Sequence, residues 1–153
     1  MLMFEIFGVP APQKRARFHR IGKFVSTYDP QRVDKKKIQW QLRSLYREEP
    51  IKTPVIVEVL FGLPIPQKTS KVKTRQMLQG DIVPMKKPDI DNLLKFILDC
   101  LTGILFDDDS QIIEVKAKKF YSETPRTVIR TTCLNNIHDE MRDLNMETSP
   151  KSM

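Results

Sequence analysis

Residues that commonly bind soft metals or form cross-links are scarce in this chain. Its 153 residues include two cysteines, Cys100 and Cys133, and two histidines, His19 and His138. Two cysteines are too few for a disulfide framework and form no Cys-x-x-Cys spacing, which indicates a reducing, cytoplasmic setting. A zinc site of histidine and cysteine is not expected either. Any metal site would therefore consist of carboxylates, which favour Mg²⁺ or Mn²⁺.

Long apolar runs are also missing. No run approaches the roughly 18 residues that a membrane span requires, so we expect no membrane partner. The first ten residues contain Glu5 and Pro10 but no base, unlike a secretion signal, and they read as a first strand. Hydrophobic residues make up 40% and charged residues 29% of the chain, as in globular proteins, and the length suits one compact domain.

Basic charge is plentiful but local. The net charge is +7, yet residues 11–40 hold nine bases against two acids and residues 67–87 hold six against one, which leaves the remainder negative. Such local basicity suits a face that contacts phosphates, although a solubilising surface would look similar. The predicted DNA-binding residues are Lys14, Arg15, Arg17, Arg20, Lys23, Lys71, Lys73, Arg75, Lys86 and Lys87.

Apolar periodicity predicts the main elements. Strands are predicted over residues 2–9, 53–63, 111–121 and 127–133, and helices over residues 30–48 and 91–102. The strand at 53–63 is apolar almost throughout, which predicts a central strand buried on both faces. The last two strands read as a hairpin, because a Thr124-Pro125 turn separates them.

Two basic segments complete this outline. Residues 13–28 read as an arm of two short strands around an Ile21-Gly22-Lys23 turn, and residues 67–87 as a long loop with one helical turn over 71–78. The pattern predicts an α/β domain of the α+β type over residues 1–133. It would have a mixed sheet of four to five strands, two main helices and basic loops around the active site. Residues 134–153 read as a polar C-terminal extension with a short helix, partly disordered.

The stretch with most chemical information begins Lys86-Lys87-Pro88-Asp89-Ile90-Asp91-Asn92-Leu93-Leu94-Lys95. Pro88 favours an extended backbone before it and aspartate favours a helix start, so Asp89 and Asp91 should lie where the loop becomes a helix. On that helix Asp91, Lys95 and Asp99 are spaced four residues apart and form one polar stripe. Charges on a largely buried helix need mutual pairing or a bound ion.

Two interpretations of these carboxylates remain open on sequence grounds. Asp89 or Asp91 could cap the helix and Asp91 could form an ordinary ion pair with Lys95, while Asp107-Asp108-Asp109 forms a solvated turn. Alternatively, the strand that follows Asp109 packs beside the helix. Asp109 would then converge with Asp89 and Asp91 on a cluster that a divalent cation stabilises.

Taken together, these residues resemble the RusA family of Holliday-junction resolvases, endonucleases common in phages and prophages. The family signature has the form basic-Pro-Asp-x-Asp-Asn-x-x-Lys followed later by Asp-Asp-x-Gln, and Asp108-Asp109-Ser110-Gln111 fits the second part. Gly8-Val9-Pro10-Ala11-Pro12 is similar to the Gly-x-Pro-x-Pro opening of many members. Ala16 departs from the proline common there. The resemblance spans roughly residues 4–133.

The resemblance implies specific roles for the polar residues. The metal-binding catalytic aspartates correspond to Asp89, Asp91 and Asp109, with Asp108 as the alternative third ligand, and the catalytic lysine corresponds to Lys95. Asp99 and Gln111 match further recurrent positions. The implied cofactor is Mg²⁺, with Mn²⁺ as a substitute. Lys95 would offset charge on the phosphate or orient the nucleophile.

The implied substrate is branched DNA in recombination and repair. Resolution of a four-way junction needs two matched nicks, which a symmetric homodimer supplies. Two alternatives stay open: a non-catalytic basic DNA-binding protein, and a nuclease for flaps or forks.

Overall fold

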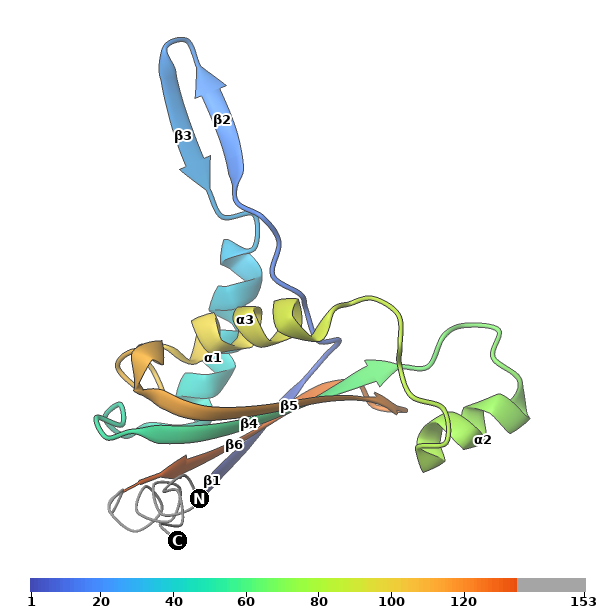
Figure 1. Cartoon of the computed structure of the whole chain (residues 1–153). Coiled ribbons are helices and arrows are strands. Elements are labelled where there is room, and N and C mark those ends of the chain that lie inside the picture. Colours follow the sequence, from blue (N-terminus) through green and yellow to red (C-terminus); the bar gives the residue numbers. More distant parts are fainter. Residues whose placement is uncertain (135–153) are drawn as a thin grey trace, which may run out of the picture.

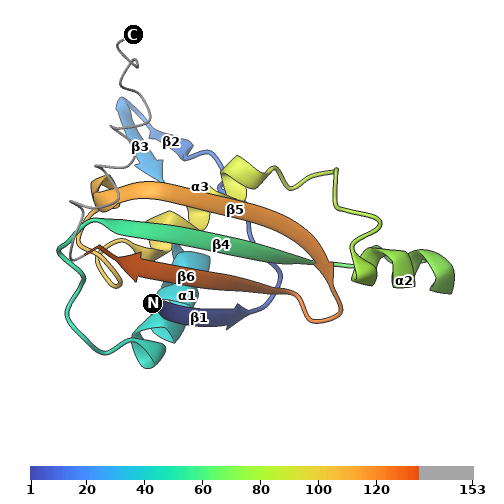
Figure 2. The ribbon, with the colours of Figure 1, turned by 60° about the horizontal axis from the view of Figure 1, so that its bottom comes forward.

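The computed structural model describes residues 1–134, which form a four-stranded sheet with helices on one face (Figures 1 and 2). The strand order is β1 (Leu2–Phe7), β6 (Arg126–Cys133), β4 (Val55–Pro64) and β5 (Ile112–Ser122). The covering helices are α1 (Arg32–Leu45) and α3 (Ile90–Leu101). The predicted α+β domain with a mixed sheet is confirmed. The predicted C-terminal extension lies outside the described residues, apart from its first residue.

Strand β4 is central, as its apolar sequence predicts. It pairs in parallel with β5 and antiparallel with β6. Its alternate residues Val55, Val57, Val59 and Phe61 are fully buried beneath the helices. The prediction of burial on both faces was wrong, because residues 56, 58 and 60 point to the other face and are only half-buried. Both helices lie on the same side of the sheet, so that second face remains partly open to solvent.

The predicted hairpin between the last two strands was also wrong. β5 and β6 both pair with β4, which lies between them, and they do not pair with each other. The short connection over residues 123–125 therefore crosses the end of β4. With neighbours on both sides, β4 satisfies the hydrogen-bonding groups along both of its edges. The Thr124-Pro125 turn signal is local, so it could not reveal that β4, which is distant in sequence, lies between β5 and β6.

The helices bury apolar stripes against the sheet. In α3, Leu93, Phe96, Ile97 and Leu101 are at most 2% exposed and belong to the core. In α1 the buried contact is Leu42, whereas Trp40 is 74% exposed. Both predicted helices are thus confirmed: α1 is shorter than predicted, and α3 begins and ends one residue earlier than predicted. The polar stripe of α3 faces solvent, so its charges are not forced into the core.

Two basic elements extend away from the sheet, on different sides of α3 (Figure 1). The arm is a two-stranded hairpin of β2 (Arg17–Ile21) and β3 (Phe24–Tyr28), and all ten of its strand residues are exposed. Gly22 turns the hairpin with a φ of 60°. α2 (Lys71–Gln79) is longer than the single turn predicted, because Ser70 caps its start and left-handed Gly80 ends it.

Neither cysteine forms a disulfide, and Cys100 is a buried residue of α3. Burial raises the pKa of the Cys100 thiol to about 12, so it is protonated at neutral pH. Among residues 1–134, no helix combines the length and apolar character that crossing a bilayer demands.

Candidate active site

The start of α3 presents two carboxylates that form no side-chain hydrogen bond or ion pair within residues 1–134. Asp89 occupies the N-cap position with an extended backbone, but its side chain accepts no capping hydrogen bond. Asp91 follows in the first turn, and both residues are exposed. The first helical bond instead uses the backbone, where the N–H of Leu93 donates to the carbonyl oxygen of Asp89 (3.1 Å). Capping therefore does not explain the Asp89 carboxylate.

Lys95 lies one turn further along the same stripe. It has the spacing for an ion pair with Asp91, yet the ion pairs found within residues 1–134 include neither residue. Lys95 is also exposed. The alternative of a helix-stabilising Asp91–Lys95 pair thus finds no support in the geometry. Asp89, Asp91 and Lys95 are left available to a ligand.

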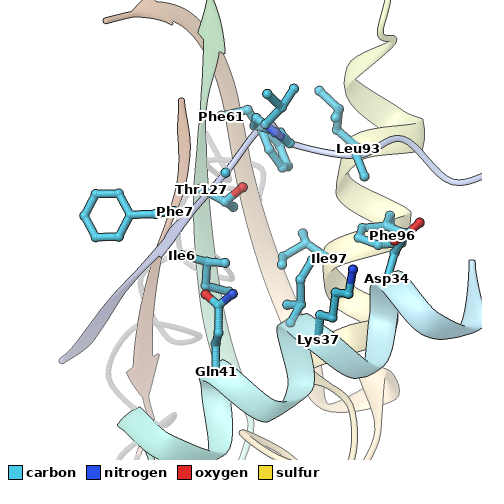
Figure 3. Close-up of a pocket in the computed structure, with 15 residues that line it drawn as sticks. Ile6, Phe7, Asp34, Lys37, Gln41, Phe61, Leu93, Phe96, Ile97 and Thr127 are labelled. Atoms are coloured by element: carbon cyan, nitrogen blue, oxygen red, sulfur yellow. The ribbon is translucent and has the colours of Figure 1, made fainter. Parts of the chain in front are cut away.

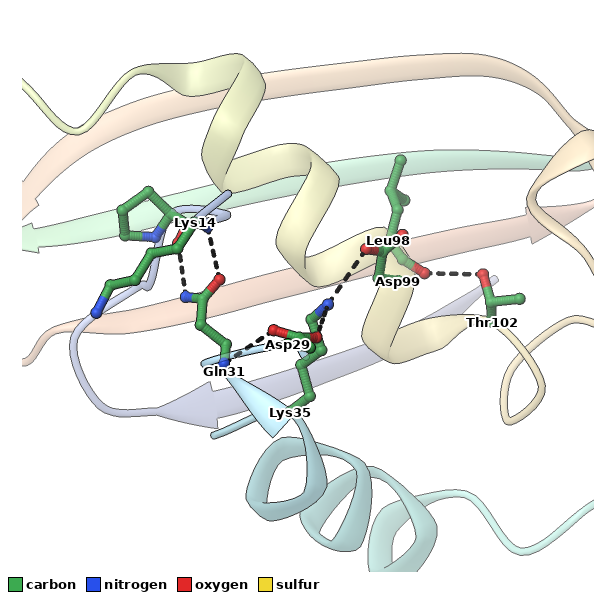
Figure 4. Close-up of polar contacts among 8 residues, drawn as sticks. Lys14, Asp29, Gln31, Lys35, Leu98, Asp99 and Thr102 are labelled. Carbon is green, nitrogen blue, oxygen red and sulfur yellow. Dashed lines mark hydrogen bonds and ion pairs between the residues drawn. The ribbon is translucent and has the colours of Figure 1, made fainter. Parts of the chain in front are cut away.

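Asp99, at the next position of the stripe, has a different partner. Its carboxylate lies 3.5 Å from the ammonium of Lys35 on α1, which also forms a hydrogen-bonded ion pair with Asp29 at 2.8 Å (Figure 4). Burial opposes the charge of Lys35, but the hydrogen bond and charge of Asp29 and then Asp99 outweigh it and raise the pKa of Lys35. The hydrogen bond from Lys35 also lowers the pKa of Asp29. Asp99 therefore helps to join α1 to α3.

The acidic turn after α3 is organised by its own side chains. Asp108 caps a short 3-10 helix (Asp109–Gln111) by accepting a hydrogen bond from the N–H of Ser110 (2.9 Å). Gln111 completes a capping box, because its Oε1 accepts from the N–H of Asp108 (2.8 Å). The Nε2 of Gln111 donates to the carbonyl oxygens of Ile51 and Thr53. Asp108 and Gln111 thus have structural roles, which favours Asp109 over Asp108 as a metal ligand.

Asp109 does not join the aspartates at the start of α3 within one chain. The hydrogen bond that it shares with Asp108 raises the pKa of Asp109, and the negative charge of Asp99 adds to this effect. Asp99 lies eight residues after Asp91, or roughly 12 Å along a helix that rises about 1.5 Å per residue. In the part of the chain that the structure describes, no three side chains of His, Cys, Asp or Glu are grouped as a metal site requires. A metal-binding role for Asp109 stays a prediction.

A cleft of about 670 Å³ opens beside Asp89. Asn92, Lys86 and Lys87 line it together with Tyr121. Its remaining walls are rich in proline and consist of Pro10, Pro12, Pro64, Pro66, Pro84 and Pro88 with Val9, Gln13 and Leu63. Proline fixes φ, so these walls have few ways to change shape. The prolines of the N-terminal Gly-x-Pro-x-Pro segment thus form part of the cleft next to the candidate catalytic residues.

Hydrogen bonds join the segment of residues 12–14 to α3 and to the start of α1. The N–H of Gln13 donates to the carbonyl oxygen of Asn92 on α3 (2.8 Å), and the Oε1 of Gln13 is buried without a partner among the described residues. Gln31, only 2% exposed, accepts from the N–H of Lys14 (2.6 Å) and donates to the carbonyl oxygen of Pro12 (2.8 Å) (Figure 4). Sequence patterns gave no sign of Gln13 or Gln31, because both act through contacts between distant segments.

The predicted DNA-binding bases surround this region and are exposed. Lys86 and Lys87 lead into α3, and Lys14 and Arg15 lie between the cleft and the arm. The bases at 17, 20 and 23 belong to the arm, and those at 71, 73 and 75 to α2. Figure 1 shows the start of α3 between these two projections. The positive groups thus approach the candidate site from more than one direction.

A second cavity, of about 360 Å³, lies between β1, α1 and α3 (Figure 3). Its lining is mainly apolar, with Asp34, Lys37 and Gln41 contributed by α1, and Phe7 points away from the helices in this view. Asp89, Asp91 and Lys95 do not line it. The candidate chemistry therefore belongs to the proline-walled cleft.

Exposed carboxylates and a lysine between basic projections are the features of a protein that acts on phosphodiesters. Comparison with known proteins agrees with this class. Residues 8–132 match the family model described as Endodeoxyribonuclease RusA, and the chain belongs to this family of DNA-cleaving hydrolases.

The matches to two relatives each cover most of this chain and most of the relative. The chain is similar to the uncharacterized protein YqaN of Bacillus subtilis (strain 168), at 36% identity over 133 residues, which cover 84% of this chain and 93% of the relative. It is also similar to the crossover junction endodeoxyribonuclease rusA of Lactococcus phage r1t, at 26% identity over 132 residues, which cover 84% of this chain and 94% of the relative.

Proposed function

We propose that the protein resolves Holliday junctions by paired symmetric nicks in DNA recombination and repair, using Mg²⁺ at a site that includes Asp89 and Asp91. Family membership and the name of the phage relative support an endonuclease for crossover junctions. One observation carries the site assignment. Asp89, Asp91 and Lys95 are exposed in the first turns of α3, and within residues 1–134 none of them forms an ion pair or a side-chain hydrogen bond.

The donor set suits the proposed metal. Mg²⁺ prefers oxygen ligands and often uses one or two carboxylates together with water and substrate phosphate, which Asp89 and Asp91 can satisfy. Gln13, a residue of the same cleft, adds a buried Oε1 that has no hydrogen-bond donor within residues 1–134. Asp109 stays the proposed third carboxylate, and to meet Asp89 and Asp91 at one metal ion it would have to move from its position in this structure. When bound, Mg²⁺ or Mn²⁺ would polarise the scissile phosphate and lower the pKa of a coordinated water.

The chain's own residues would bind and orient the DNA around this centre. Lys95 projects from the same face of α3 as Asp91, so its ammonium can offset charge that develops on the phosphate or hold the attacking water. Lys86 and Lys87 would hold the backbone that flanks the cut, and the arm and α2 would contact the junction arms.

A homodimer is proposed because a four-way junction has near two-fold symmetry and each chain offers one such site. A cytoplasmic location likewise stays a prediction.

The decisive experiment compares DNA substrates. The purified protein would be incubated with a labelled mobile four-way junction, a flap, a fork and a linear duplex, each with Mg²⁺ and with EDTA. Mg²⁺-dependent cleavage of the junction in preference to the other three is expected. Preference for flaps or forks would contradict the resolvase assignment, and an absence of cleavage on all four would leave the non-catalytic DNA-binding alternative.

A further inference from the structure

Lys119 is a cation in a position where strand geometry predicts an apolar side chain. It lies opposite Phe61 in the parallel β4–β5 pairing. Alternate residues of β4 and β5 face the same side of the sheet, so Lys119 shares the helix-covered face with buried Phe61, Val59 and Val57. Its neighbour Lys118 lies opposite Leu60 and faces the uncovered side. A lysine on the inner face is costly unless its ammonium is hydrogen-bonded.

The ammonium of Lys119 reaches the segment that leads into α3. Its Nζ donates to the carbonyl oxygen of Lys86 and to that of Pro88, both at 3.1 Å. The Pro88 carbonyl belongs to the peptide unit whose nitrogen is that of Asp89. Lys119 therefore fixes the backbone directly before the first candidate metal ligand. Its partners are carbonyl groups, and the ion pairs of residues 1–134 do not include it.

Few other contacts hold the backbone segment that Lys119 binds. The segment between Val83 and Pro88 has no helix or strand of its own, and among the described residues the two bonds from Lys119 are the hydrogen bonds made to its backbone. Asp89, directly after it, has an extended backbone (φ −71°, ψ 140°) and a side chain that does not cap α3. Without Lys119, the two carbonyls would lose their donor and the direction of Asp89 would be less restricted.

We propose that Lys119 is a positioning residue of the active site: by holding the carbonyls of Lys86 and Pro88, it fixes Asp89 relative to Asp91 for metal binding. This inference rests on the proposed function of the two aspartates. Through Lys119, strand β5 contributes to the site independently of the acidic turn that precedes the strand. Groups that orient metal ligands in this way commonly account for 10- to 100-fold in metal affinity or activity.

The test compares Lys119→Met with Lys118→Met, which removes the same charge from the adjacent position on the opposite face of the strand. Mn²⁺ affinity would be measured by calorimetry without DNA, and junction cleavage would be separated into kcat and KM. We expect Lys119→Met to lose about 10- to 100-fold in Mn²⁺ affinity and to lower kcat at fixed subsaturating metal. KM for the junction should change little, and Lys118→Met should match the wild type in both measurements.

Two further variants of Lys119 test whether its N–H donors are what the site requires. Lys119→Arg retains N–H donors and should recover part of the Mn²⁺ affinity. If Lys119→Met does not fold, as judged by circular dichroism, Lys119→Gln takes its place because it removes the charge and shortens the side chain while keeping it polar.

Two results would overturn the positioning role: wild-type Mn²⁺ affinity in folded Lys119→Met, or in Lys119→Gln where it takes the place of Met, or a raised KM alone, which would indicate a phosphate contact instead. A wild-type protein that neither binds Mn²⁺ nor cleaves would refute the proposed function rather than this inference.

Discussion

At the scale of single residues, the site divides into side chains with structural partners and side chains without them. Asp99 forms an ion pair, Asp108 caps a turn and Gln111 holds that turn to the loop at Ile51. Asp89 and Asp91 have neither role. This division separates carboxylates that the sequence alone presents as one acidic group, and it determines which substitutions should affect catalysis and which should affect stability.

Asp91→Asn is expected to reduce junction cleavage at least about 100-fold, because an amide replaces a charged metal ligand. Junction affinity, measured by gel shift in Ca²⁺ or EDTA, should stay within a few-fold of the wild type. Asp81→Asn, which neutralises an exposed aspartate in the preceding loop, is the matched control and should cleave normally. Undiminished cleavage by Asp91→Asn would remove this residue from the catalytic centre.

Gln111→Ala is expected to lower the free energy of unfolding by about 1–3 kcal/mol, because the half-buried carbonyl of Thr53 loses its donor and that of Ile51 keeps only the longer bond from the N–H of Asp107 (3.4 Å). Urea unfolding followed by circular dichroism would measure the decrease. Gln79→Ala, at the exposed end of α2, provides the comparison and should change stability by much less. A Gln111 variant as stable as the wild type would show that the capping box contributes little.

At the scale of elements, one ionic cluster joins the two helices. Its depressed Asp29 pKa contributes stability above the usual carboxylate pKa of 3.8, and this contribution is lost as pH falls through the lower folded value. The raised Lys35 pKa contributes stability below 10.5, which is lost as pH rises through the higher folded value. The cluster should therefore stabilise the α1–α3 contact across the neutral range.

Lys35→Met should accordingly cost about 1 kcal/mol near neutral pH, with a smaller difference from the wild type below about pH 4 and above about pH 10.5. Unfolding free energies of both proteins across this range would test it. Lys36→Met, on the exposed side of α1, should show no such pH dependence. A constant difference between Lys35→Met and wild type at every pH would indicate that packing, rather than charge, is responsible.

The arm offers a second prediction at this scale. Neutralising Arg17, Arg20 and Lys23 together should weaken junction binding. The slope of log affinity against log salt concentration should also become shallower, by about 0.9 for each duplex phosphate that the arm no longer neutralises. Fluorescence anisotropy at several salt concentrations would measure both quantities. The control neutralises Arg43, Lys52 and Lys118, three exposed bases outside the arm. Equal weakening in both triple variants would mean that overall charge, rather than the arm, governs binding.

Sequence patterns predicted elements better than they predicted neighbours. The amphipathic stripe of α3 and the apolar run of β4 identify these elements because the signal lies within each segment. The false hairpin of β5 and β6 arose because β4, about 50 residues earlier, inserts between them. The placement of Asp89, Asp91 and Lys95 was readable from spacing along one helix. Lys119, Gln13 and Gln31 were not, since each acts by contacting a segment distant in sequence.

At the scale of the whole molecule, one nuclease domain places the start of α3 between two basic projections (Figure 1), and the cleft lies beside Asp89 at that start. The proposed reaction requires two such sites acting together on one junction. Sedimentation equilibrium should therefore give a mass of about twice 17.9 kDa. A monomer that stays monomeric when bound to the junction would contradict the proposed symmetry.

The central claim, paired nicking of a four-way junction, is tested most directly by the products from a supercoiled plasmid that extrudes a cruciform. Two nicks made in one binding event would linearise the plasmid, whereas a single nick would release the supercoiling, reabsorb the cruciform and leave an open circle. Linear DNA is the expected main initial product with Mg²⁺, and no cleavage is expected with EDTA. Accumulation of nicked circles without linear product would contradict paired nicking.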